Sequence, residues 1–150
     1  MKWIFAAIAI FAGALLPLQA LINAQLGRQS SGALFASVCS FLVGTMALCL
    51  LLVASRQPLP SLDSLLRLPA WIWLGGLLGA FFVFVATLAI PRLGASALVA
   101  LVVGGQMAAA LAYDYFGVLQ APQTIGLSRL FGAVLVLAGV LLVMEPWKAK

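Results

Sequence analysis

The sequence is poor in charged residues and contains no histidine. Eight Lys and Arg residues stand against three Asp and Glu residues, and only 7% of the 150 positions are charged, whereas 65% are hydrophobic. A soluble domain is typically about 25% charged. So few polar side chains cannot solvate the surface of a soluble fold of this length, and the composition therefore predicts a protein embedded in a lipid bilayer.

The same shortages exclude most enzymatic chemistry. Without histidine, and with three acids in all, the chain cannot assemble a metal cluster or a nucleophile with its base and orienting group. It also lacks a Gly-rich phosphate loop between a strand and a helix. Cys39 and Cys49 fall on one predicted helix about 15 Å apart, too far for a mutual disulfide. We expect no enzyme activity, no metal and no cofactor.

Five apolar runs are long enough to cross a membrane, which takes roughly 20 residues. Because continuous apolar runs of this length cross lipid as helices, we predict an all-α polytopic membrane protein with one five-helix transmembrane domain over residues 1–150. The odd number of spans places the two termini on opposite sides of the membrane. The predicted spans cover residues 3–26, 33–54, 71–90, 95–113 and 130–144.

Positive charge is divided evenly between the two sides that these spans define. Orientation follows the Lys and Arg excess of short loops, so an even division predicts dual topology. The single, scattered cations look like interfacial anchors, and we expect the lipid bilayer rather than nucleic acid as a partner. One side carries Lys2, Arg56, Arg67 and Arg129, and the other carries Arg28, Arg92, Lys148 and Lys150.

Dual topology suggests how a short chain could form a transporter. Secondary transporters are usually built from inverted repeats, and an antiparallel dimer of five-helix chains would supply that inversion with ten helices. Gly132 and Gly139 lie one heptad apart, and we expect them to form the dimer interface because small residues allow close helix approach. For the glycine pairs of residues 75–80 and the small residues of 104–112, packing within the chain and packing between chains are both open.

Polar residues inside the first span are candidates for a binding site. Gln19 and Asn23 are four residues apart and share a helix face, and Pro17 precedes them. An interior proline removes a backbone hydrogen bond, so we expect a broken helix whose two amides contact a substrate. The alternative is a proline kink whose amides bond to neighbouring helices.

Two further positions could carry function. Gln106 is the deepest amide, beside Gly104 and Gly105, and we expect it to line a substrate cavity. Asp114 ends the fourth predicted span and Arg129 begins the fifth, where each opposes the helix dipole. The two could form a structural ion pair, or Asp114 could couple transport to a proton or a cation.

Several short motifs occur in a characteristic order along nearly the whole chain. They are PLQ at 17–19, NAQL at 23–26, GGLLGA at 75–80, PRLGA at 91–95, GQ at 105–106, DYFG at 114–117, RLFG at 129–132 and AGV at 138–140. Together they resemble the drug/metabolite transporter superfamily, and more narrowly its short branch of five-helix inner-membrane exporters. The last span also resembles the dimerising helix of small multidrug-resistance transporters, but the membrane-embedded glutamate of that four-helix group is missing.

The resemblance implies a multi-pass protein of the bacterial inner membrane that acts as half of a transporter. It implies pairing as an antiparallel homodimer or with an oppositely oriented paralogue. We therefore hypothesise a secondary exporter of a small molecule that works by alternating access. The alternative is a membrane scaffold or accessory subunit without transport activity of its own.

Overall fold

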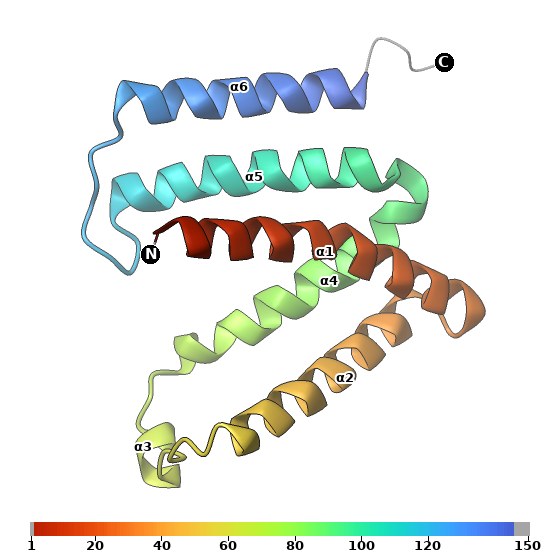
Figure 1. Ribbon diagram of the computed structural model, residues 1–150, viewed down its shortest axis with the longest axis vertical. Helices are drawn as coiled ribbons and strands as arrows, with labels where there is room; N and C mark the ends of the chain where they lie inside the picture. The colour runs from red at the N-terminus through yellow and green to blue at the C-terminus, as the bar shows by residue number, and fades with distance from the viewer. Residues whose placement is uncertain (1, 146–150) are drawn as a thin grey trace. The chain divides into compact units, whose positions relative to one another are not determined.

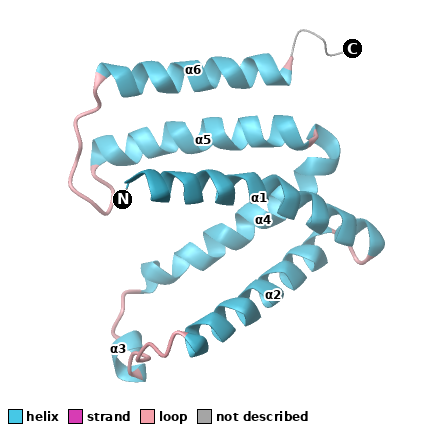
Figure 2. Ribbon diagram, viewed as in Figure 1, coloured by secondary structure: helices cyan, strands magenta, loops and turns pink. Residues whose placement is uncertain are grey.

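The computed structural model describes residues 2–145, and every regular element in that range is a helix (Figures 1 and 2). Five helices are long and apolar enough to cross a membrane. They are α1 (Lys2–Gln29), α2 (Ala33–Ala54), the continuous Ala70–Leu93 segment, α5 (Ala95–Phe116) and α6 (Leu127–Met144). The Ala70–Leu93 segment joins the 3-10 helix η1 (Ala70–Trp73) to α4 (Leu74–Leu93). The predicted all-helical class with five spans is confirmed.

Proline does not end or break these helices where the sequence suggested it would. Helix α1 continues across Pro17 to Gln29, and α4 continues through Pro91 to Leu93. The expectation of a broken helix before Gln19 and Asn23 is therefore wrong. A proline removes one backbone bond, and a transmembrane helix can absorb that loss by local adjustment.

The chain divides into two compact units, residues 1–92 and 93–150. The first contains α1, α2, α4 and the short helix α3 (Leu62–Leu66), whose N-cap Ser61 accepts a hydrogen bond from the backbone N–H of Ser64. The second contains α5 and α6. The expectation of one domain over residues 1–150 stays a prediction.

Small residues make the contact between α1 and α2. Ala20 and Ala24 of α1 and Ala36 and Ser37 of α2 are all buried, which lets the two backbones approach closely, as small residues do between membrane helices. At the turn, a Cβ added to Gly27 would lie 3.2 Å from the carbonyl carbon of Gly32. A side chain at position 27 would therefore press closely against the backbone of the turn.

Helix α4 contributes the rest of the first unit's buried surface. Ala86 and Ile90 are buried, and Thr87 is 2% exposed. The Thr87 hydroxyl donates to the carbonyl of Val83 at 2.7 Å, so its polarity is satisfied within its own helix. Most large apolar side chains of both units face outward, as expected for surfaces that meet lipid.

In the second unit, α5 and α6 lie side by side and antiparallel (Figure 1). Gly104 is buried at their contact, where an added Cβ would lie 2.9 Å from Cγ2 of Val140 and 3.5 Å from Cδ2 of Leu137. Helix α5 ends in Gly117, which has a φ of 66°. That left-handed conformation favours glycine and directs the chain into the loop of residues 118–126.

Candidate functional site

Gln19 and Asn23 lie in one groove between α1 and α2. Both side chains line it, and Ser40 faces them from α2. The Gln19 Nε2 donates to the Ser40 hydroxyl at a long 3.4 Å. The groove has a volume of about 380 Å³, and its remaining walls are Cys39 and the aliphatic side chains of Leu15, Leu18, Ile22, Leu26 and Val43. Helical spacing places both amides on the α2-facing side of α1.

Asn23 is the least satisfied polar side chain of the groove. The residue is 4% exposed, and its Nδ2 has no hydrogen-bond partner among the described residues. A buried polar group without a partner costs about 1–3 kcal/mol. Native proteins rarely leave a buried polar group without a partner.

Gln106 belongs to the second unit, and its side chain makes no hydrogen bond to any residue within 2–145. It is exposed and lies two residues beyond Gly104, which is buried against α6. Residues two apart point in roughly opposite directions from a helix. Gln106 therefore points away from α6, and its amide is open to a partner from outside this unit.

Asp114 organises the loop that joins α5 to α6. Its Oδ2 lies 3.7 Å from Nη1 of Arg129, and its Oδ1 accepts from Nε2 of Gln120 at 2.8 Å. Its backbone carbonyl accepts from the N–H of Gln123 at 2.8 Å, and Nη1 of Arg129 also donates to Oε1 of Gln123 at 3.4 Å. The Asp114 side chain is 29% exposed and that of Arg129 is 56% exposed, so this exposed pair contributes little by itself.

Gly132 and Gly139 are both open within the chain. A Cβ added to either glycine would meet no atom within 4 Å, in contrast to Gly104 at the α5–α6 contact. Close packing against the described residues of the second unit therefore does not explain either glycine.

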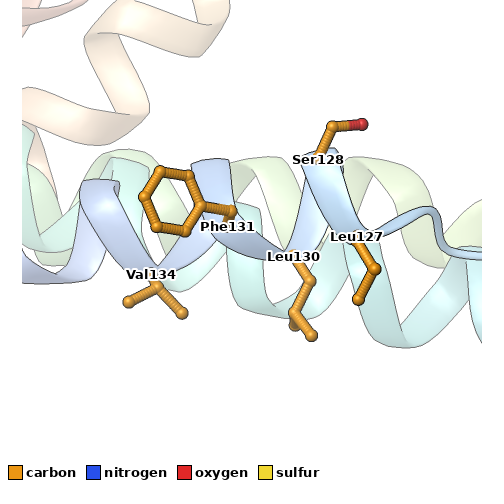
Figure 3. A pocket seen from close by; sticks show the side chains of 5 residues that line it. All are labelled: Leu127, Ser128, Leu130, Phe131 and Val134. Atoms are coloured by element: carbon orange, nitrogen blue, oxygen red, sulfur yellow. The ribbon is translucent and has the colours of Figure 1, made fainter.

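Helix α6 also has a shallow apolar hollow over its first two turns. Figure 3 shows the side chains around it, and Ser128 supplies the polar one. The others are Leu127, Leu130, Phe131 and Val134. Ser128 is the one polar residue of this lining, so the hollow offers a polar ligand little to orient it.

Sequence reasoning missed three parts of this arrangement. Ser40 is not among the predicted site residues, but it shares the groove with Gln19 and accepts a hydrogen bond from it. Cys39, which the sequence excluded only from a disulfide with Cys49, lines the same groove. Gln120 joins Asp114 across the loop. No local pattern marked these residues, because each pairing depends on which helix faces lie together.

A comparison with protein families finds a match over the stretch that contains these motifs. The family model described as "Putative inner membrane exporter, YdcZ" matches residues 4–142. The chain belongs to the YdcZ family. No curated protein and no solved structure shows a match to it.

Membership in the YdcZ family fixes the location and the general class. The protein is a multi-pass protein of the inner membrane, in agreement with the five helices that are able to span it. The resemblance to short drug/metabolite exporters is confirmed, and the family description is that of an exporter rather than an enzyme. Within residues 2–145, no three His, Cys, Asp or Glu side chains gather into a possible metal site.

Proposed function

We propose that this YdcZ-family protein is one half of a secondary exporter, which works by alternating access as an antiparallel dimer. The α1–α2 groove is its substrate contact. The single observation that carries this proposal is Asn23, a residue that lines the groove together with Gln19 and Ser40 and whose buried Nδ2 lacks a partner among the described residues. A scaffold would instead be expected to pair such an amide with a neighbouring helix.

Gln106 supplies a second substrate contact in this proposal. Its amide is exposed at mid-span and has no partner among the described residues. Polar groups at that depth in a membrane protein usually face a bundle interior or a cavity. Asp114 has a structural role in the loop between α5 and α6, because its two carboxylate oxygens already face Gln120 and Arg129.

The dimer is supported by helix α6 and by the charge distribution. Gly132 and Gly139 repeat after one heptad and leave open space beside the helix, which a second helix could occupy closely. Of the eight cations in the even tally, Lys148 and Lys150 lie outside the described residues. In the proposed dimer the two chains have opposite orientations, and a paralogue of fixed opposite orientation could replace one of them.

Flux measurements test the exporter directly. Proteoliposomes containing the full chain are loaded with a radiolabelled library of small metabolites, and efflux is compared with that from protein-free vesicles. Wild-type protein should release some members of the library, and the double variant Gln19→Leu/Asn23→Leu should not. Gln25→Leu is the control, since Gln25 lies on α1 outside the groove and bonds to Arg28. No flux from folded wild-type protein would favour the scaffold.

Topology is tested with two charge-biased variants. About three lysines added at the N-terminus, or about three at the C-terminus, should fix opposite orientations, because the predicted termini lie on opposite sides and loop charge directs insertion. Each variant expressed alone should be inactive, and the two expressed together should restore flux. Full activity of either variant alone, with a single orientation shown by cysteine labelling at position 2, would refute the antiparallel dimer.

A further inference from the structure

We infer that the α1–α2 groove selects neutral, amphipathic molecules that carry a hydrogen-bond-accepting oxygen, such as an amide, ketone or ester carbonyl. This inference rests on the proposed exporter function and names its substrate class. It follows from three properties of the groove: the kind of polar atom left without a partner, the absence of charge from the lining, and the apolar character of the remaining wall.

The unpartnered atom is a donor. Nδ2 of Asn23 carries N–H groups that only an acceptor can satisfy. An ammonium group has donors and no acceptor, so it cannot meet this need. A carbonyl oxygen can. The second amide donor, Nε2 of Gln19, makes only the long 3.4 Å contact with Ser40, and a stronger acceptor in the groove could take over that donor.

The lining argues against a charged substrate. None of the nine residues that line the groove is charged. The nearest cation on α1, Arg28, lines a different hollow with Thr87 and Pro91, and it donates to Gln25. A carboxylate or phosphate group could accept from Asn23 but would remain without a counter-charge, which is costly in hydrocarbon. The groove thus favours an acceptor without net charge.

The apolar wall of the groove determines the character of the rest of the substrate. Five aliphatic side chains and Cys39 surround the three polar residues, so most of a bound molecule would contact apolar surface. A volume of about 380 Å³ falls at the lower end of the range of about 300–1,000 Å³ for small-molecule sites. The expected substrate therefore has a compact apolar body and one or two acceptor oxygens.

Four compounds that share one phenylbutyl body separate these possibilities. N,N-dimethyl-4-phenylbutanamide offers a neutral acceptor, 4-phenylbutyrate an anion, 4-phenylbutyl-trimethylammonium a cation, and butylbenzene no polar group. Their binding to the full chain in vesicles is measured by the rate at which N-ethylmaleimide alkylates Cys39. The thiol of Cys49 is the internal control, because it lies outside the groove on the same helix.

The amide should slow alkylation of Cys39 and leave that of Cys49 unchanged. Butylbenzene should bind about tenfold more weakly, since it leaves the Asn23 donor without a partner. Asn23→Leu should abolish the advantage of the amide, and Gln25→Leu should preserve it. Asn23→Asp should make the ammonium compound bind more tightly than the amide. If Asn23→Leu does not fold, the relative protection of Cys39 by the four compounds in the wild-type chain still shows whether the groove prefers the neutral acceptor.

The outcomes separate this inference from the exporter proposal. Asn23-dependent protection and flux of the cation or the anion would overturn the neutral class and leave an exporter. Protection by the amide without its flux would overturn the exporter and leave the recognition chemistry. No protection by any compound overturns the inference. The inference is also overturned if none of the four compounds changes the alkylation rate of Cys39 but replacing ester-linked phospholipid with ether-linked phospholipid raises it. In that case lipid carbonyl groups, and not a substrate, would occupy the groove.

Discussion

Gly104→Ala should loosen the contact between α5 and α6. A Cβ at position 104 would lie 2.9 Å from Cγ2 of Val140 and 3.5 Å from Cδ2 of Leu137. Valine has little freedom to rotate away on a helix, because its χ1 is largely restricted to one rotamer. Overpacking of this kind costs about 1–3 kcal/mol, and alanine returns at most about 1 kcal/mol of helix propensity. We therefore expect a net loss of about 1–2 kcal/mol in the free energy of unfolding.

The neighbouring glycine provides the matched control. A Cβ at Gly105 would meet no atom within 4 Å, so Gly105→Ala should be neutral or should stabilise the chain by up to about 1 kcal/mol. The double variant Gly104→Ala/Val140→Ala should recover part of the loss, because it removes the methyl group that the new Cβ contacts. Reversible unfolding of the purified chain in mixed micelles gives the three free energies. Equal destabilisation by Gly104→Ala and Gly105→Ala would refute the packing argument.

Three further predictions concern residues outside this contact. Gly139→Leu should lower the dimer fraction in bilayers, measured by single-molecule photobleaching, while leaving the stability of the chain unchanged, since position 139 is open within it; an unchanged dimer fraction would place the interface elsewhere. Gln106→Leu should preserve or raise the melting temperature and reduce flux per folded protein, because its amide has no partner among the described residues; a loss of about 1–2 kcal/mol with flux intact would make the residue structural. Gly117→Ala should destabilise the α5–α6 loop by about 1–2 kcal/mol in chemical unfolding, because its φ is 66° and the new Cβ would lie 2.6 Å from Cγ of Pro122; a neutral result would contradict that loop geometry.

The candidate site was only partly readable from the sequence. Spacing placed Gln19 and Asn23 on one face of a helix, and the structure puts both in one groove. The same spacing could not identify Ser40 as the residue opposite them or show that Asn23 Nδ2 lacks a partner. Both facts depend on how α2 lies against α1, and that arrangement is set by small residues distributed over both helices.

Proline shows a second limit of local reasoning. Pro17 suggested a broken helix and Pro91 the end of one, because an isolated helix loses a hydrogen bond and gains a clash at proline. Both residues are nevertheless helical. In lipid, a backbone that leaves the helical conformation loses many more hydrogen bonds than the one that proline removes.

The sequence by itself determined that the chain is a membrane protein with five helices and belongs among short inner-membrane exporters. Every backbone hydrogen bond must be satisfied in lipid, and continuous apolar runs of about 20 residues satisfy theirs as helices. The tertiary structure decided which glycine serves which contact. Gly104 meets Val140, whereas Gly105, Gly132 and Gly139 stay open. The four residues are chemically identical along the chain, and only the packing of α6 against α5 distinguishes Gly104 from the other three.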